Sequence, residues 1–453
     1  MKLQSGKSQH SSSRSRVGAC VLLAVVLMPG VATAQSFALN EHSTVELGRA
    51  NSGATVQADD ASAAFSNPAA MTQIQRPTYS ASLSGISGDS VRFVDRGSVD
   101  LLGRPLGPPA KDFLDDGLIP AVHVVYPVAD RWVLGLSVTA PFGLSTSYPD
   151  AWAGRYQAID SDLLTVNINP SVAYKVSDSL SVGLGVSAMY ADAELSNAID
   201  FGAVCFGTLG ASNCTPLGLV PQATDGRVVV KGDDWGFGFN AGLTWTPAKD
   251  ILLGLHYRSE VKQKLSGSAD FTVPTAARVL TTGGSFSDTG ASAKIDLPAT
   301  LEAGVQWRAT EQLTLYGDVR WRGWSSVDEL RVQFDNVTQS DAVDELRYKD
   351  ATRIAVGLDY CLNDHWTLRG GIAQDETPTR DAYRTARISD DDRNYYALGA
   401  SWAAGDGWQL DFAYNRVEIA DHAFDHVGDF SERLRGAYEG AADIISIGFT
   451  WRP

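Results

Sequence analysis

From residue 78 to the C-terminus, the hydrophobic and polar positions of the chain alternate with a period of two. In the last such stretch, small or polar residues separate Ile445, Ile447, Phe449 and Trp451. Successive side chains of a β-strand point to opposite faces, so the pattern predicts strands with one apolar and one polar face. The period alone does not decide whether the apolar face meets a protein core or lipid.

The lengths of the connections separate these two cases. Fourteen alternating runs can be counted, at residues 78–87, 119–128, 132–142, 163–176, 180–193, 235–247, 250–262, 297–308, 312–324, 352–362, 365–375, 394–404, 408–417 and 443–451. Connections of two or three residues (129–131, 177–179, 248–249, 309–311, 363–364, 405–407) alternate with long ones (88–118, 143–162, 194–234, 263–296, 325–351, 376–393, 418–442). Short turns at one end, long loops at the other and an even strand number are typical of outer-membrane barrels. We therefore predict an all-β fold, a 14-stranded antiparallel transmembrane β-barrel over residues 78–453.

The positions of the tryptophans support this fold independently. Seven tryptophans lie within a few residues of a short turn and on the apolar face of their strand: Trp132, Trp245, Trp307, Trp366, Trp402, Trp408 and Trp451. Indole rings prefer the boundary between lipid headgroups and hydrocarbon. These residues therefore predict an aromatic girdle at the periplasmic end of the barrel.

The first 34 residues have the pattern of a secretory signal peptide. Basic residues precede the apolar run 17–31, and Ala32-Thr33-Ala34 forms an A-x-A cleavage site. The apolar run continues after Cys20, which argues against lipid attachment to that cysteine. Beyond residue 34 no apolar stretch approaches the roughly 18 residues of a transmembrane helix. The expected location is the outer membrane of a Gram-negative cell, with multiple passes.

Charge and motifs exclude several classes of function. The net charge is −16 at pH 7, and loss of the basic signal peptide makes the mature chain more acidic, which disfavours nucleic acid as a partner. No G-x-S-x-G, H-E-x-x-H, C-x-x-C or P-loop motif is present, so we expect no enzyme and no cofactor. The pair His422 and His426 is better explained as solvated loop residues than as a metal site.

Residues 35–77 precede the first strand and lack a sustained alternation. A barrel of fourteen strands leaves a lumen too wide for side chains alone to fill. We therefore predict that this segment is a hatch inside the barrel; a disordered periplasmic tail is the alternative. The stretch 58–70 indicates a short helix followed by a turn at Asn67 and Pro68, in which the asparagine side chain can close an Asx turn.

Two outer loops carry unusual chemistry. Cys205 and Cys214 are predicted to form a disulfide in this exported protein, although two unpaired thiols are the alternative. Loops 194–234 and 263–296 are rich in apolar residues, among them Phe201, Phe206, Leu217, Leu219 and Phe271. Such residues either form a surface groove that captures a hydrophobic ligand or pack on each other to hold the loops shut.

Several segments resemble the FadL family of outer-membrane long-chain fatty-acid transporters. They include SFALNEHSTVELGRANSG, ADDASAAFSNPAAMT, GLSTSYPDAWAGRYQA, LTVNINPSVAYKVSDSLSVGLG and RIAVGLDYCLNDHWTLRGGIAQDETP, in order through the mature chain. The resemblance implies a fourteen-stranded barrel with an N-terminal hatch, in which Asn67, Pro68 and Ala69 match the Asn-Pro-Ala motif. Two features depart from the family: the chain ends in FTWRP instead of an aromatic residue, and the loop 194–234 carries a cysteine pair.

The resemblance also implies a binding site and an exit route. Phe37, with Leu39 close by, matches a position that contributes to ligand binding in the family. Pro141, Phe142 and Gly143 match the kink of the family's third strand, through which a ligand would leave sideways into lipid. The alternative is that the strand simply ends there, since proline and glycine are unfavourable inside a central strand.

Three functions remain open at this point. The first is passive uptake of long-chain fatty acids by a monomer in contact with outer-membrane lipid, and the second is a channel for monoaromatic hydrocarbons. The third, a structural or adhesive barrel, is disfavoured by the predicted hatch and the apolar loops. A cation facing an apolar pocket would distinguish a fatty acid from an aromatic hydrocarbon. The candidates on the predicted lumenal face are Arg320, Arg322, Arg353 and Arg369.

Overall fold

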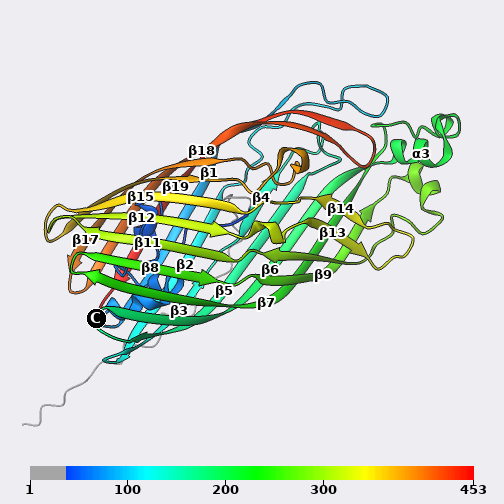
Figure 1. Ribbon diagram of the computed structural model, residues 1–453. Helices are drawn as coiled ribbons and strands as arrows, with labels where there is room; N and C mark the ends of the chain where they lie inside the picture. The colour runs from blue at the N-terminus through cyan, green and yellow to red at the C-terminus, as the bar shows by residue number, and fades with distance from the viewer. Residues whose placement is uncertain (1–36) are drawn as a thin grey trace, which may run out of the picture.

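The computed structural model of the protein describes residues 37–453, so the expected signal peptide lies outside the described residues. The described chain forms a closed antiparallel β-barrel (Figure 1). The first strand, β1 (Thr78–Asp95), pairs on one side with β2 (Gly117–Ala129) and on the other with the last strand, β19 (Arg433–Trp451). Within residues 37–453, every helix is too short or too polar to span a bilayer.

The barrel has the predicted fourteen strands, some of which are interrupted. Besides β1, β2 and β19, the continuous strands are β5 (Asp160–Lys175), β6 (Leu180–Asp200), β7 (Asp225–Ala248), β16 (Trp366–Asp375), β17 (Arg393–Gly405) and β18 (Trp408–Val427). The interrupted strands are β3 (Trp132–Thr139) with β4 (Gly143–Ser147), β8 (Ile251–Arg258) with β9 (Val261–Thr272), β10 (Thr289–Leu297) with β11 (Thr300–Arg308), β12 (Leu313–Arg322) with β13 (Glu329–Phe334), and β14 (Ala342–Glu345) with β15 (Ala351–Cys361). Each predicted run overlaps one of these strands, which confirms the fold class.

The strands continue further outward than predicted. The hairpin of β6 and β7 keeps its ladder up to the pair Asp200 and Asp225, so the loop predicted at 194–234 is shorter. Its remainder holds the helices α3 (Phe201–Leu209), α4 (Ala211–Cys214) and η2 (Thr215–Leu217), at the end of the barrel opposite the C-terminus (Figure 1). The predicted loop 263–296 holds most of β9 and β10, with η3 (Thr275–Thr281) between them. Above the membrane the outer face meets water, so the alternation that marks a strand fades.

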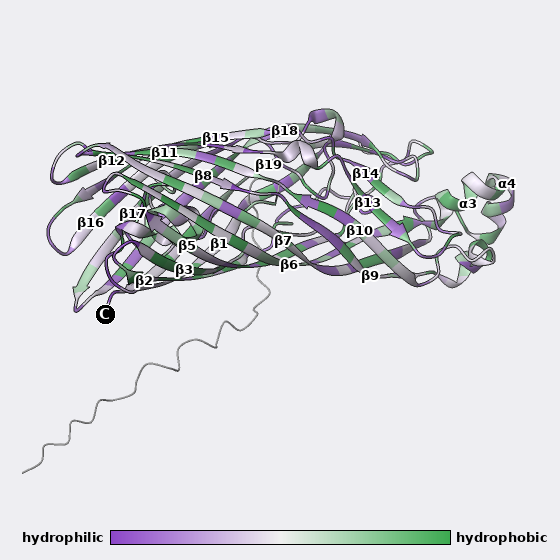
Figure 2. Ribbon diagram, turned by 60° about the horizontal axis from the view of Figure 1, so that its bottom comes forward, coloured by the Kyte–Doolittle hydropathy of each residue, from purple (hydrophilic) through white to green (hydrophobic). Residues whose placement is uncertain are grey.

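The apolar face of the strands points outward. Hydrophobic and hydrophilic residues alternate along the barrel strands (Figure 2). Six of the seven predicted girdle tryptophans have exposed side chains, between 39% and 50%, and Trp451 is partly exposed. Trp408 stacks on Trp451 with ring centroids 5.3 Å apart. The prediction of their outward orientation is confirmed.

The segment 37–77 lies inside the barrel and is almost entirely buried. It contains α1 (Thr44–Leu47), α2 (Ala63–Ser66) and η1 (Pro68–Gln73). Arg49 in this segment is fully buried, with ion pairs to Asp359 at 2.8 Å and to Asp59 at 3.2 Å. Its guanidinium also lies 4.1 Å from the ring centroid of Tyr316. Two further short helices, η4 (Trp324–Ser326) and η5 (Asp381–Tyr383), lie in outer connections.

Asn67 closes the predicted turn and attaches it to the barrel wall. Its side-chain oxygen accepts from the backbone N–H of Ala69 at 3.1 Å. Its amide donates to the carbonyl of Thr55 at 2.6 Å and to the carbonyl of Leu243 on β7 at 3.2 Å. The wall has glycine where the turn approaches it most closely. A Cβ on Gly242 would lie 1.9 Å from Asn67 Oδ1, and one on Gly183 would lie 2.5 Å from the nitrogen of Ala69. A larger residue at either position would displace the turn.

Candidate functional site

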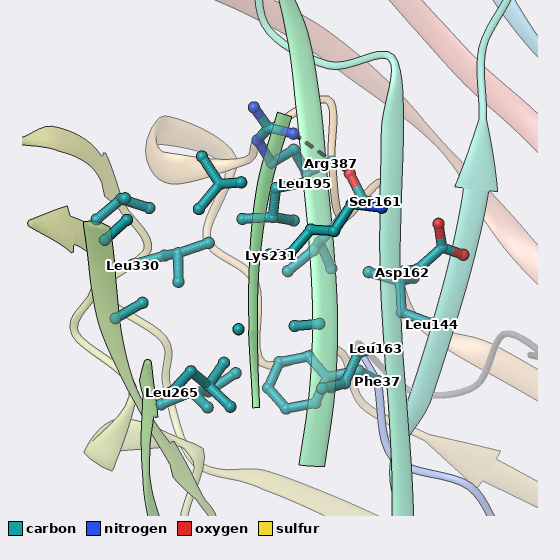
Figure 3. Close-up of a pocket in the computed structure, with 18 of the residues that line it drawn as sticks. Phe37, Leu144, Ser161, Asp162, Leu163, Leu195, Lys231, Leu265, Leu330 and Arg387 are labelled. Atoms are coloured by element: carbon teal, nitrogen blue, oxygen red, sulfur yellow. Dashed lines mark hydrogen bonds between the residues drawn. The ribbon is translucent and has the colours of Figure 1, made fainter. Parts of the chain in front are cut away.

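An apolar cavity of about 80 Å³ lies inside the barrel, between the N-terminal segment and the outer parts of the strands (Figure 3). Strands β4, β5, β6, β7, β9, β10 and β13 contribute to its wall, as do the connections around residues 327, 346 and 388. Its apolar lining consists of Phe37, Leu144, Leu163, Ala193, Leu195, Val230, Leu265, Ala291, Ala293, Ile295, Val327, Leu330, Val332, Leu346 and Ile388. Segments that are far apart in the sequence thus meet around one cavity.

Phe37 is held at one end of this cavity by other aromatic rings. It is 1% exposed, and its ring contacts Trp324 edge to face, with centroids 4.7 Å apart. The Phe142 ring lies 6.1 Å away. Edge-to-face pairs at such distances add about 0.5–1.5 kcal/mol to the burial of the rings. Phe37 therefore forms a well-packed wall of the cavity.

Arg387 lies at the other end of the cavity (Figure 3). Its Nη2 donates to Asn197 Oδ1 at 2.9 Å and its Nη1 to the carbonyl of Ser196 at 3.1 Å. Its ion pair is with Asp344, 3.4 Å from Nε and itself 40% exposed. Burial lowers the pKa of the Arg387 guanidinium below its usual range, and Asp344 opposes this shift. The group stays protonated at neutral pH, so it brings a positive charge to an apolar cavity.

The other charged residues of the lining have closer partners. Lys231 pairs with Glu194 at 2.8 Å, and Glu329 pairs with Arg331 at 2.6 Å. The Asp162 carboxylate points away from the apolar lining (Figure 3) and lies 2.6 Å from Ser145 Oγ. Arg387 is therefore the residue of the lining best placed to receive an anionic group.

The third barrel strand is interrupted between β3 and β4, at residues 140–142. The ladder between β2 and β3 ends at Val122 and Val138, so residues 117–121 of β2 pair only with β1. On the β5 side, the Thr165 hydroxyl satisfies both backbone groups of Phe142, at 3.0 and 2.6 Å. The hydrogen-bonded ladder of the barrel wall is thus interrupted beside β2.

The N-terminal segment pairs with the part of the third strand, between β3 and β4, that β2 does not reach. The N–H of Leu39 donates to the carbonyl of Pro141 at 2.9 Å, and the N–H of Gly143 donates to the carbonyl of Phe37 at 2.8 Å. Ala38 lies opposite Phe142 in an antiparallel bridge. Three residues of the N-terminal segment therefore serve as a short strand at the interruption.

The structure brings together some of the predicted site residues and separates others. Phe37 lines the cavity, whereas Leu39, also buried, packs in a neighbouring cluster. Phe201 and Leu219 are fully buried in the cluster that supports α3, and Phe206 and Phe271 pack partly against it. Leu217 is 50% exposed. These four residues and Leu217 lie outside the cavity.

A disulfide joins Cys205 to Cys214, with Cα atoms 5.9 Å apart, and both cysteines belong to the cluster that supports α3. The apolar residues of this outer loop therefore pack on one another around a covalent link. Leu209 and Leu217 at the rim of this loop, and Val279 on the neighbouring η3, are between 43% and 50% exposed and offer apolar surface to solvent.

The four candidate arginines face the lumen but not the cavity. Arg320 and Arg322 donate to Asn40 Oδ1 at 2.7 and 2.8 Å, and Arg320 also pairs with Glu302. Arg353 donates to the carbonyl of Ala50 at 2.6 Å. Arg369 lies 3.4 Å from Asp359, the partner of Arg49. These arginines therefore hold the segment 37–77, and the sequence interpretation missed Arg387.

The alternation in β9 could have revealed part of the cavity. The alternation of Val261 and Lys262, at the end of a predicted strand, continues through Gln263, Lys264 and Leu265 into the stretch that was interpreted as loop. Arg387 carries no such signal, because it lies in an irregular connection between β16 and β17.

Comparison with known proteins agrees with this architecture. A family model described as "Outer membrane protein transport protein (OMPP1/FadL/TodX)" matches residues 25–452. The chain belongs to this family. The FadL-family relatives include a long-chain fatty acid transport protein of Escherichia coli O6:H1, 34% identical over 86% of this chain and 88% of that protein. Outer membrane protein P1 of Haemophilus influenzae is 30% identical over 86% of this chain and 87% of its own length.

Solved structures of the FadL family share the fold. A FadL homologue from Pseudomonas aeruginosa superimposes with a TM-score of 0.82 at 26% identity, over 92% of this chain and 99% of that one. The toluene transporter TbuX of Ralstonia pickettii has a TM-score of 0.65 at 21% identity, over 90% and 98% of the two chains, which shows the fold alone. The protein is thus a Gram-negative outer-membrane transporter of hydrophobic substrates and not an enzyme.

Proposed function

We propose that this transporter takes up long-chain fatty acids, which bind with the carboxylate at Arg387 and the acyl chain along the apolar cavity. The observation that carries the proposal is the buried guanidinium at one end of a mostly apolar lining. A charge-assisted hydrogen bond to a carboxylate is about twice as strong as a neutral one. The acyl chain would run past Leu163 and Leu265 toward Phe37 (Figure 3).

The ligand first meets the outer end of the barrel. We assign capture to the exposed rim residues Leu209, Leu217 and Val279, which stand on the disulfide-linked cluster. Exposed apolar groups on a rigid support bind hydrophobic molecules without the cost of ordering a loop. From this rim the ligand would pass inward to the cavity.

In the next step, the bound ligand would displace the short N-terminal strand that closes the barrel wall. The cavity of about 80 Å³ is smaller than the roughly 150 Å³ that accommodate benzene in an engineered protein core, so an acyl chain must displace part of the lining. Phe37 belongs both to the lining and to the short strand that closes the interruption. Displacement of Phe37 would withdraw this strand from Pro141 and Gly143.

The ligand would leave sideways through the resulting opening between β2 and the β3–β4 interruption. In lipid, an acyl chain avoids a cost of about 0.8 kcal/mol for each CH₂ exposed to water. The lumen below the cavity is unfavourable for an acyl chain, because the segment 37–77 places buried polar and charged groups there. In this proposal residues 35–77 act as the hatch that keeps polar solutes out.

The competing function is transport of a monoaromatic hydrocarbon, as the name of the TbuX transporter states for that protein. An apolar lining suits both ligands, but toluene has no carboxylate with which the buried cation could form an ion pair. Affinities of the purified protein for oleate, oleyl alcohol and toluene would separate the two functions. We expect Arg387→Met to weaken oleate binding at least tenfold and to leave oleyl alcohol binding unchanged.

A matched control for this experiment is Arg384→Met. Arg384 is a buried arginine of the same connection, with ion pairs to Asp381 and Asp391, and it does not line the cavity. Equal loss of oleate binding in both variants would show general damage to the loop. Unchanged oleate affinity in Arg387→Met, or tighter binding of toluene than of oleate by the native protein, would refute the proposal.

A further inference from the structure

Two lysines face each other on the outer wall of the barrel. Lys264 on β9 is the direct cross-strand partner of Lys294 on β10. Both side chains are exposed, and they point outward, since their neighbours Leu265 and Ala293 line the inner cavity. Neither lysine has an ion pair within residues 37–453. Like charges placed directly opposite each other destabilise a sheet, so this pair favours an anion that lies between its members.

The other lysines of this wall have carboxylate partners. Lys262 lies 3.3 Å from Glu260 and faces Asp296 across the ladder, and Lys231 pairs with Glu194. Within residues 37–453, the acidic groups closest to the lysine pair form no ion pair with it. Asp234 accepts from the backbone N–H of Lys264 at 2.6 Å. Asp233 lies opposite Asp192 on one side and opposite Ser266 on the other, two residues beyond Lys264. The positive charge of Lys264 and Lys294 therefore lacks an ion-pair partner on this wall.

The lysine pair lies at the outer edge of the lipid-facing surface. On the adjacent strand β7, Trp235, Phe237 and Phe239 are 49%, 73% and 52% exposed and lead up to its level. Strands β7, β9 and β10 run along one wall (Figure 2). From Ile251 at the periplasmic turn to Lys264, a rise of about 3.3 Å per residue and a tilt of about 40° give a height of roughly 30 Å. The apolar band of such barrels is about 25 Å tall, so the lysines reach the headgroup level.

We propose that Lys264 and Lys294 together bind a phosphate group of a phosphorylated glycolipid in the outer leaflet. The two ammonium groups supply the charge, and the aromatic residues on β7 receive the acyl chains below. This combination of adjacent cations and apolar surface fits a lipid better than a free anion, because a free anion would contact the lysines but not the aromatic surface. The lipid site lies on the opposite face of the wall from the fatty-acid cavity, so it does not depend on the proposed transport function.

Native mass spectrometry of the full barrel in detergent can test the lipid site with diphosphorylated lipid A as the probe. We expect the double variant Lys264→Gln, Lys294→Gln to retain this lipid at least tenfold less than the native protein. Lys262→Gln is the matched control, on the same strand and face, and should bind within twofold of the native protein. Lipid A without its phosphates should not distinguish the variants. Retained oleate binding would show that the double variant is folded.

A second measurement uses the repulsion between the lysines. Without lipid A, the double variant should melt at a higher temperature than the native protein, because the like charges are gone. With lipid A in bicelles, the native protein should melt at a higher temperature than the double variant. Equal lipid A retention by the native protein and the double variant, or an unchanged order of melting temperatures, would overturn the proposal. Displacement of bound lipid A by millimolar inorganic phosphate would instead identify a site for free anions.

Discussion

The backbone N–H of Gly143 donates a 2.8 Å hydrogen bond to the carbonyl of Phe37, at the one place where the third barrel strand is interrupted. The ring of the same Phe37 lines the apolar cavity. The position of one residue therefore determines both the shape of the cavity and the closure of the wall. Two backbone hydrogen bonds contribute about 1–3 kcal/mol to this closure, an amount that a bound acyl chain can offset.

A reversible cross-link tests whether the N-terminal segment must leave. Ala38 and Phe142 are bridge partners, and paired residues of antiparallel strands have Cα atoms about 4.5–5.5 Å apart, within the range of a disulfide. We expect Ala38→Cys with Phe142→Cys, in a Cys361→Ser background, to bind oleate but not to transport it when oxidised. Reduction should restore uptake into cells. The Cys361→Ser chain controls for effects on the native disulfide, and normal uptake by the oxidised protein would contradict lateral exit.

Removal of the Phe37 ring should weaken ligand binding. Phe37 is fully buried against Trp324 and lines the cavity. An aromatic contact of this size contributes roughly 1.5–3 kcal/mol, so Phe37→Ala should raise the dissociation constant for oleate about tenfold or more. Titration calorimetry measures this change. Leu39→Ala is the control, because Leu39 is buried in the same segment but outside the cavity. If both variants lose affinity equally, Phe37 is not a direct contact.

Arg49 should be essential for the seal of the lumen. Arg49→Met removes the charge that compensates Asp359 and Asp59, and breaking a buried ion pair costs about 3–5 kcal/mol. We expect the segment 37–77 to loosen, which planar-bilayer recordings would detect as a rise in ion conductance. Arg92→Met breaks the exposed pair with Glu439 and should leave the conductance at the native level. An unchanged conductance in Arg49→Met would refute the role of Arg49 in the hatch.

The last outer loop should become less stable as the pH rises. Burial raises the pKa of Glu432 from its ordinary value near 4.5 to about 7. Because the folded pKa is the higher one, the stabilisation is complete below pH 4.5 and is lost as the pH rises through about 7. By pH 8 the loss amounts to roughly 3 kcal/mol of local stability.

Amide hydrogen exchange of residues 428–432, corrected for intrinsic rates, would follow this change between pH 5 and pH 8. Glu432→Gln keeps the contact to Gln157 without a titrating carboxyl group, so its protection should be independent of pH. A native loop with the same protection at both pH values would exclude Glu432 as the cause.

Strand number and orientation were predictable because lipid imposes a strict alternation on the outer face. Phe412 and Ile447, for example, are exposed cross-strand partners on that face, as their parity predicted. The outward extension of β6 and β7 was not predictable in this way. Beyond the membrane, side chains on both faces meet water or loops, and the alternation weakens there.

The candidate site was only partly readable from the sequence. Phe37 was assigned through a family resemblance, and the structure places it at one end of the cavity. Arg387, 350 residues later in the sequence, lies at the other end, and the sequence pattern gave no sign that the two share a cavity. The position of Arg320 in the alternation of its strand correctly predicted that its side chain faces the lumen. The alternation could not predict its hydrogen-bond partner there, Asn40, which lies 280 residues away in the sequence.

The pairing of β1 with β19 constrains the route by which the N-terminal segment reaches the lumen. The segment enclosed by the barrel is made first, and Thr44 within it contacts Ser446 on the last strand at 2.7 Å. A folded segment cannot pass between two strands once they are hydrogen-bonded along their length. After the closing step, in which β19 joins β1, the segment can reach the lumen only through an open end of the barrel. Until it is inside, Arg49 lies apart from Asp359, and that carboxylate has only Arg369 as its counter-charge.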